Sequence, residues 1–158
     1  MDVASRSRAR VQERLEHLEA EFGSVEVTQT TFEVGPGRYQ RAVENSRDGH
    51  LDIRAVVRDE DGAVLLRDDD EIPGGQTRPN ERLDEAVRRV VRETADVNCS
   101  VTGASTANIH GIRNEETDET VYRLSVVFTA EIADAEVSAD ESVRWEGEAA
   151  GERVTPRR

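Results

Sequence analysis

Residues 72–97, with the sequence IPGGQTRPNERLDEAVRRVVRETADV, decide the fold of this chain. The segment begins with a glycine-rich turn and continues into a helix that we expect over about residues 81–95. Apolar residues follow one another in this helix at steps of three and four, which places them on one helical face. They are Leu83, Ala86, Val87, Val90 and Val91. We therefore expect this face to pack against the rest of the molecule.

The start of the helix carries negative charge. Asn80 suits the N-cap position, because its side-chain oxygen can accept a hydrogen bond from an unpaired backbone N–H group of the first turn. Glu81, Asp84 and Glu85 follow, and the helix dipole favours carboxylates at this end. The sequence therefore predicts that the helix begins directly after Asn80.

The spacing of these residues resembles the signature of the Nudix hydrolases, G-x5-E-x7-R-E-U-x-E-E-x-G-U, in which U is a bulky aliphatic residue. The residues that stand where the signature requires them are Gly75, Glu81, Arg89, Val91, Glu93 and Val97. The lead-in Ile72-Pro73-Gly74-Gly75 also looks like the family's usual approach to the motif. The strand pattern from about residue 50 to 147 is compatible with the same fold.

Three positions depart from the signature. Val90 and Thr94 replace two of the family's glutamates, and Asp96 replaces its last glycine. In the family, carboxylates at positions 90, 93 and 94 lie on one helical face and hold divalent cations, which neutralise a pyrophosphate and activate the attacking water. In this chain that face offers one carboxylate, Glu93, and one neutral hydroxyl. The segment that matches this signature, residues 75–97, is called the box below. It is therefore degenerate at the positions of the metal ligands.

The resemblance implies roles for the residues that match. Gly75 would offer its backbone carbonyl, and Glu93 its carboxylate, to Mg²⁺ or Mn²⁺, which makes Glu93 the candidate catalytic residue. Arg89 would pair with Glu81 to fix the helix against the loop that starts at Gly74. We expect any cation to be bound weakly unless acids from elsewhere complete the site. Candidates for that role are Glu71, Glu115, Glu116, Glu119 and Glu141.

The composition is strongly acidic. There are 34 Asp and Glu residues against 21 basic residues, all of them arginine, and the net charge is −13. This balance resembles cytosolic proteins of extreme halophiles. In salt at about 1 M the Debye length falls to about 3 Å, so repulsion among surface carboxylates is largely screened. We expect a cytoplasmic protein whose stability rises with salt. The charge argues against binding of nucleic acid polymers and anionic membranes, but one locally basic pocket can still bind a nucleotide.

The length of 158 residues suits one domain with a core of its own. The single cysteine, Cys99, excludes a disulfide within the chain and a thiolate zinc site. No apolar segment reaches the length of a transmembrane helix. We expect residues 1–48 to form an N-terminal extension of helix and strand, residues 49–147 a Nudix-like domain, and residues 148–158 a polar tail.

The predicted fold class is α/β of the α+β type, a Nudix-like α/β/α sandwich with a mixed sheet. The expected elements are a helix at about 5–22 that stops at Gly23, strands at 25–34, 50–58, 63–67, 101–112, 120–132 and 142–145, and the box helix. Residues 37–48 are expected to form a loop with one helical turn at most. Tyr39 in this loop either stacks on a bound base or, the commoner case, pins the loop to the core. His110 is expected to be a hydrogen-bonded structural residue. The family's closing helix should be short or absent after residue 146, and the N-terminal helix would take its place.

Three functional hypotheses follow. The first is an enzyme related to nucleoside diphosphate-X pyrophosphohydrolases, whose hydrolysis is weak, altered or absent because the metal ligands are incomplete. The second is a catalytically silent nucleotide-binding or regulatory module. The third is a structural domain that forms a homodimer through the N-terminal helix.

Overall fold

The computed structural model describes residues 2–67, 69–133 and 143–146. In chain order the elements are α1 (Val3–Phe22), β1 (Glu26–Val34), α2 (Pro36–Arg47), β2 (Asp52–Arg58), β3 (Val64–Arg67), β4 (Gly74–Gln76), α3 (Leu83–Ala95), β5 (Cys99–Asn114), β6 (Thr120–Ile132) and β7 (Val143–Glu146). The predicted α+β fold with a mixed sheet is confirmed. No helix in the described ranges is both long enough and apolar enough to cross a membrane.

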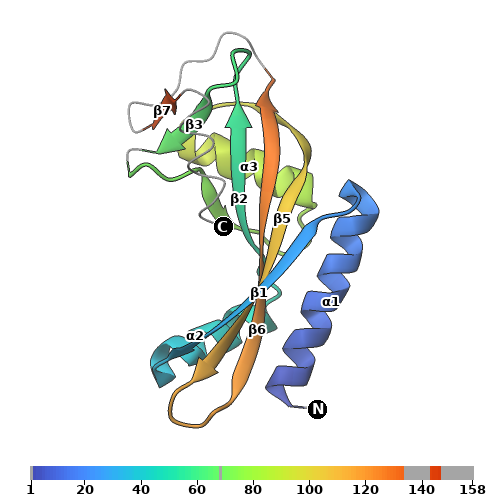
Figure 1. Ribbon diagram of the computed structural model, residues 1–158, viewed down its shortest axis with the longest axis vertical. Helices are drawn as coiled ribbons and strands as arrows, with labels where there is room; N and C mark the ends of the chain where they lie inside the picture. Colours follow the sequence, from blue (N-terminus) through green and yellow to red (C-terminus); the bar gives the residue numbers. More distant parts are fainter. Residues whose placement is uncertain (1, 68, 134–142, 147–158) are drawn as a thin grey trace.

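The sheet is built around two long strands, β5 and β6, which run along most of the molecule (Figure 1). Its strand order is β1-β5-β6-β2-β3-β7, and the short strand β4 pairs with β2. β1 is parallel to β5 and β2 is parallel to β6, whereas the other pairs are antiparallel. β4 brings the glycine-rich turn into the sheet, a pairing that the sequence did not predict.

α1 is the expected N-terminal helix, and it begins two residues earlier than predicted. The side chain of Asp2 caps it by accepting a hydrogen bond from the backbone N–H of Ser5 at 2.8 Å. Gly23 ends it with φ 84°, a left-handed conformation that favours glycine. The buried residues of this helix are Ser7, Val11, Leu15 and Leu18.

α2 corrects the prediction of a loop over residues 37–48. It is a helix of 12 residues, and Pro36 stands in its first turn, where a fixed φ is compatible and the missing N–H is not needed. Its buried residues fall at steps of three and four: Tyr39, Ala42, Val43 and Ser46. Apart from Pro36 and Gly37, only three of the 12 residues of α2 are apolar, so the sequence shows a weak helical period and tertiary packing stabilises the helix.

α3 begins at Leu83, and Asn80 is not its N-cap. The N-cap is Arg82, which makes no side-chain capping bond, and Asn80 has φ 62° in the turn before the helix. Asn tolerates this left-handed conformation better than most residues. Glu81 closes the turn instead, because its Oε1 accepts a hydrogen bond from the backbone N–H of Arg78 at 2.9 Å. Asp84 and Glu85 occupy the first turn, as predicted.

The end of α3 explains one departure from the Nudix signature. Asp96 is the C-cap residue with φ 54° and ψ 40°, the left-handed conformation in which helices commonly end at glycine. Its backbone N–H donates to the carbonyl of Arg92 at 2.8 Å. The chain therefore keeps at this position the backbone geometry that the signature's glycine would adopt most easily.

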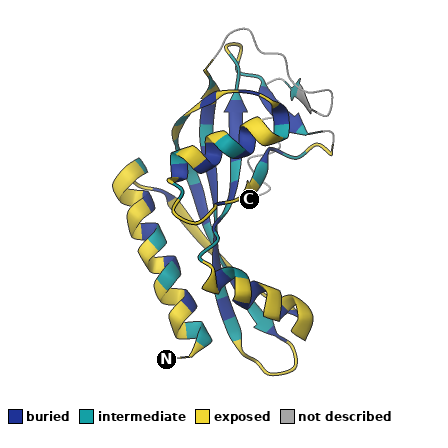
Figure 2. Ribbon diagram, turned by 180° about the vertical axis from the view of Figure 1, so that it is seen from behind, coloured by how far each residue is buried: buried dark blue, intermediate teal, exposed yellow. Residues whose placement is uncertain are grey.

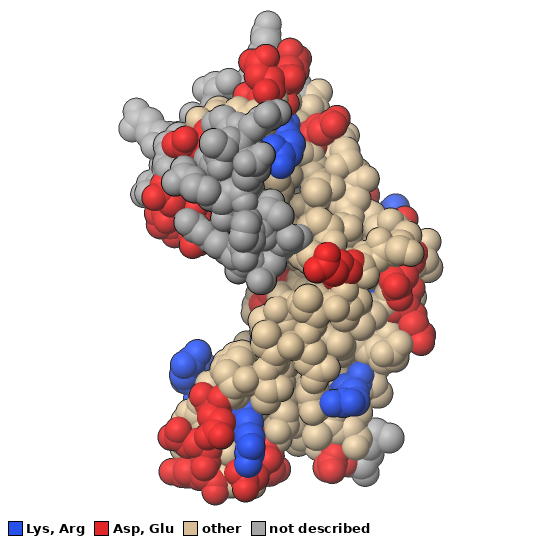
Figure 3. Space-filling view, in the orientation of Figure 1, with Lys and Arg blue, Asp and Glu red and all other residues tan. Residues whose placement is uncertain are grey.

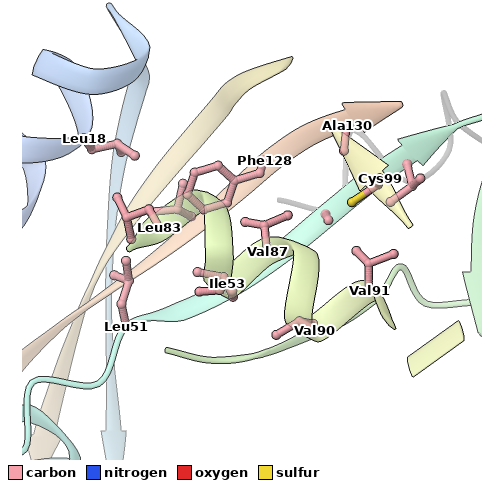
Figure 4. Packing of buried hydrophobic residues seen from close by; sticks show 14 of the residues in the cluster. Leu18, Leu51, Ile53, Leu83, Val87, Val90, Val91, Cys99, Phe128 and Ala130 are labelled. Carbon is pink, nitrogen blue, oxygen red and sulfur yellow. The ribbon is translucent and has the colours of Figure 1, made fainter. Parts of the chain in front are cut away.

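The main core lies between the sheet and the two helices α1 and α3. Figure 4 shows Val87, Val90 and Val91 of α3 in one buried cluster with Ile53 of β2 and Phe128 of β6. Leu18 of α1 belongs to the same cluster. Both helices therefore cover the same face of the sheet, and Figure 2 shows α3 lying across that face with its exposed side outward.

α2 covers the other face at the opposite end of the molecule. It packs against Val121 of β6, within a separate cluster that also contains Val34 and Tyr39. Adjacent residues of a strand point to opposite faces, so Val121 and Leu124 face different layers. The helices thus flank the sheet on both sides, and Figure 1 shows α1 and α2 on opposite sides of its lower half. The closing helix expected after residue 146 falls outside the described residues.

Candidate functional site

The candidate site is built where β4 and α3 meet. Gly74 and Gly75 pair with Arg54 and Ile53 of β2, which fixes the glycine-rich turn as an edge of the sheet. A Cβ placed on Gly75 would lie 3.1 Å from the Cγ2 of Val90. Glycine at this position therefore allows α3 to approach the turn closely.

Val90 fills the space between α3 and the turn. Its side chain is 4% exposed and belongs to the main core cluster. The Nudix signature that the sequence resembles has a glutamate at this position, but here the apolar face of the helix extends as far as Gly75. The position that would bring a carboxylate near the Gly75 carbonyl is instead part of the hydrophobic core.

Glu81 and Arg89 form a nearly buried ion pair that ties α3 to its own lead-in. Nε of Arg89 donates to Oε2 of Glu81 at 2.7 Å and Nη2 donates to Oε1 at 3.0 Å. Nη2 also donates to the backbone carbonyl of Gln76 at 2.6 Å. The two side chains are only 14% and 13% exposed. This bidentate geometry holds the helix, the turn and β4 together.

The same pair governs the charge of Glu81. The hydrogen bond from Arg89 is the largest cause that lowers the pKa of Glu81 below its usual value, and it outweighs the opposing effect of burial. Arg89 in turn has a raised pKa, chiefly because of its hydrogen bond to Glu81. Both groups are therefore charged at neutral pH.

Glu93 is held by two arginines. Nη1 of Arg89 donates to its Oε1 at 2.9 Å, and Nη2 of Arg78 donates to the same oxygen at 3.2 Å and to Oε2 at 3.4 Å. Arg89 is the largest cause of the lowered pKa of this carboxyl group. Glu93 is thus ionised, but its charge is already matched by guanidinium groups. Arg78 was not among the residues expected here, and nothing in the motif singles it out.

The donor set does not fit a resident Mg²⁺ or Mn²⁺ ion. These cations are held by several oxygen ligands, usually with more than one carboxylate. Glu93 is the single carboxylate at helix positions 90, 93 and 94. The guanidinium groups of Arg78 and Arg89 already form ion pairs with it. Within the described ranges, no group of three or more His, Cys, Asp or Glu residues is arranged to hold a metal ion.

The acids proposed to complete the site come from separate parts of the chain. Glu71 lies 3.7 Å from Arg54, with which it forms an ion pair. Glu115, Glu116 and Glu119 lie at the turn between β5 and β6, at the far end of the molecule from α3 (Figure 1). Glu141 lies outside the described residues.

Tyr39 and His110 lie away from the box. Tyr39 is 6% exposed within the α2 cluster, and burial raises the pKa of its hydroxyl group. His110 contacts the hydroxyl of Ser125 at 2.9 Å through Nε2 and that of Thr30 at 3.4 Å through Nδ1. Burial lowers the pKa of His110. Tyr39 is thus packed in the core, and His110 makes hydrogen-bond contacts with neighbouring strands.

No protein-family model matches the chain, and no curated protein matches it. Among solved structures, a Nudix hydrolase from Nitrosomonas europaea is 17% identical with a TM-score of 0.48, covering 64% of this chain and 58% of its own. A MutT protein from Methanosarcina mazei is 22% identical with a TM-score of 0.41, covering 68% and 93%. A putative oxidoreductase from Sinorhizobium meliloti is 14% identical with a TM-score of 0.46, covering 77% and 42%.

Proposed function

We propose that this chain is a Nudix-type domain that binds a nucleotide or another nucleoside diphosphate derivative, and that its pyrophosphohydrolase activity is weak, altered or absent. The motif residues and their contacts support the proposal. Gly75 lies against position 90 of the helix, and the signature's glutamate and arginine, Glu81 and Arg89, are ion-paired. The framework of the box is thus retained although its ligands are not.

One observation carries the second half of the proposal. Glu93, the remaining ligand of the helix, makes ion pairs with both Arg78 and Arg89. A divalent cation would have to displace these guanidinium groups and would gain only one carboxylate in return. Such a site competes poorly with water for the cation. We therefore favour a catalytically silent binding or regulatory module over a proficient hydrolase.

The acidic surface leaves few places for a negatively charged ligand. In Figure 3, acidic side chains gather in clusters at the ends and along the right edge of this face, and arginines appear as isolated patches, some of them beside the acidic clusters. A polymer such as DNA needs a continuous basic surface. A single nucleotide needs only one basic pocket, so nucleotide binding is compatible with the acidic charge of this chain.

Turnover assays test the proposal directly. A panel of nucleoside diphosphate derivatives is incubated with the protein at molar salt, with Mn²⁺ in one series and with a chelator in the other, and released nucleoside monophosphate and bound nucleotide are both measured. We expect at least one nucleotide to bind in the presence of chelator, with little or no hydrolysis in either series.

Glu93→Gln is the informative variant, because it removes the charge and keeps the shape. Brisk Mn²⁺-dependent turnover that this variant abolishes would contradict the proposal and establish an active enzyme. Arg88→Gln, on the exposed side of the same helix, is the matched control and should behave as the wild type. Failure of every nucleotide to bind would refute the nucleotide-binding half.

A further inference from the structure

A small recess between α1, the end of α2 and β6 is lined by three arginines. Its wall contains Arg10 and Arg14 of α1, Arg123 of β6, and His50. The apolar part of the wall is formed by Val11, Leu51 and Leu124. None of the described residues that line the recess is acidic, although the whole chain carries a charge of −13.

Arg123 is the buried member of the group. Its side chain is 7% exposed, and Nη2 donates to Oδ2 of Asp52 at 3.0 Å and to the backbone carbonyl of His50 at 3.4 Å. Its Nε is buried and has no hydrogen-bond partner among the described residues. A buried donor without a partner is unfavourable in a folded protein, and an acceptor oxygen that reached it would relieve this cost.

Arg10 and Arg14 bond only to neutral oxygens. Nη1 of Arg10 donates to the hydroxyl of Ser46 at 3.3 Å, and Nη2 of Arg14 donates to the backbone carbonyl of Gly49 at 2.7 Å. Gly49 has φ 76°, so the turn after α2 depends on glycine to present that carbonyl. No described carboxylate lies within ion-pair distance of either guanidinium group. Two of the three positive charges in the recess are therefore unmatched.

We propose that this recess binds a phosphate group. Guanidinium groups are suited to phosphate, because their N–H donors match its oxygens in pairs and remain charged at any physiological pH. The recess has a volume of about 30 Å³, which is about two to three times the minimum needed for one water molecule. A volume this small excludes a nucleoside, so only the phosphate group itself can enter the recess.

A wider groove adjoins the recess and shares Arg10, Arg14 and Gly49 with it. The groove has a volume of about 500 Å³ and runs between α1 and the start of α3, where Arg82 and Leu83 line it. Its lining also contains Glu13, Glu21 and Glu81, so the groove, unlike the recess, carries acidic side chains. Pockets of about 300–1,000 Å³ are the size that encloses small organic ligands. The phosphate can therefore be free, or it can be carried by a molecule whose body lies in this groove.

This proposal is independent of the metal chemistry of the box. The recess lies on the N-terminal helix and on β6, and Glu93 is not among its lining residues. Phosphate binding here should therefore persist in the presence of a chelator and in Glu93→Gln.

Titration followed by ³¹P NMR tests the proposal with inorganic phosphate, a nucleoside monophosphate and the same nucleoside without phosphate, at constant ionic strength. We expect saturable binding of phosphate, weakened about tenfold or more in Arg10→Gln and in Arg14→Gln, since each loses a charged hydrogen-bond donor. Tighter binding of the monophosphate than of phosphate, weakened in Arg10→Gln and Arg14→Gln, would assign the groove to its nucleoside, and equal affinity would assign free phosphate.

Arg88→Gln is the control for charge, and thermal unfolding shows whether each variant is folded. Arg88→Gln should bind phosphate as the wild type does, because Arg88 lies on the exposed side of α3 in an ion pair with Asp84. Equal weakening in all three variants would overturn the proposal, since it would show binding to net charge alone. Absence of saturable binding by the folded wild type, or equal binding of the nucleoside lacking phosphate, would also overturn it.

Discussion

Arginines surround two sites in this molecule, and their partners differ. At the box, Arg78 and Arg89 make ion pairs with Glu93, and Arg89 makes a further one with Glu81. In the recess, Arg10 and Arg14 bond only to a hydroxyl and a backbone carbonyl. Arginine that is matched by carboxylates within the chain acts as a structural clamp, whereas unmatched arginine is available to an anion from outside. The residues that resemble a catalytic motif therefore have the more structural role.

The largest expected effect tests whether position 90, beside Gly75, belongs to the apolar core. Val90→Glu places a carboxyl group at a position that is 4% exposed and lies against Gly75. Keeping such a group neutral at pH 7 costs about 1.4 kcal/mol for each unit above its usual pKa of about 4.3, so we expect destabilisation of about 3–4 kcal/mol. Val90→Gln has the same shape without the charge, and urea unfolding of both variants isolates the charge. Equal stabilities would show that the position is open to solvent.

The next effect tests the ion pair between Glu81 and Arg89. Arg89→Ala leaves the carboxylate of Glu81 almost buried and without its guanidinium partner. We expect a loss of about 3 kcal/mol, the lower end of the range for breaking a buried ion pair. Arg88→Ala, one residue away in an exposed pair with Asp84, should cost about 0.5 kcal/mol or less. Similar losses in the two variants, measured by urea unfolding, would remove the distinction between clamp and surface pair.

The pH dependence gives a smaller effect with a definite sign. The pKa of Glu81 is lower in the folded chain than in the unfolded one, because Arg89 stabilises the ionised form. Its contribution is therefore complete above the unfolded pKa of about 4.3 and is lost as the pH falls through the folded pKa. The stability difference between wild type and Glu81→Gln should be largest at neutral pH and shrink below about pH 4. A difference that is constant with pH would contradict the ion pair.

The smallest effect concerns the recess. Arg14→Gln removes a charge that no described carboxylate matches, so we expect the stability without phosphate to change by about 1 kcal/mol or less, the cost of the hydrogen bond to the Gly49 carbonyl. Urea unfolding in a phosphate-free buffer measures this. A loss comparable to that of Arg89→Ala would mean that Arg14 is a structural residue like the box arginines, and the comparison between the two sites would fail.

Strong periodic patterns made parts of the fold predictable from the sequence. The apolar positions of α3 and the near-continuous apolar run of β6 identified both elements, and β6 has the predicted bounds of 120–132. α2 escaped because its buried face contains few apolar residues, and Asn80 was misplaced because it serves a left-handed turn rather than a cap. Local pattern cannot distinguish these cases, since tertiary contacts decide them.

The contacts of the candidate site were only partly predictable. Glu81 and Arg89 follow from motif spacing, but Arg78 reaches Glu93 across 15 residues of chain through the turn that precedes α3. The recess joins residues 10, 14 and 123, which lie on two elements that no spacing rule connects. Long-range convergence of this kind becomes visible only when the sheet and its helices are in place.

Titration with Mn²⁺ at molar salt, followed by calorimetry, is the most direct test of the central claim that Glu93 is engaged by arginine rather than by a metal. The wild type and Glu93→Gln should give the same weak, unsaturated heats, because neither offers a set of carboxylates at the box. Saturable binding by the wild type that Glu93→Gln abolishes would contradict the claim, since it would require Glu93 to leave Arg78 and Arg89 and join a metal centre.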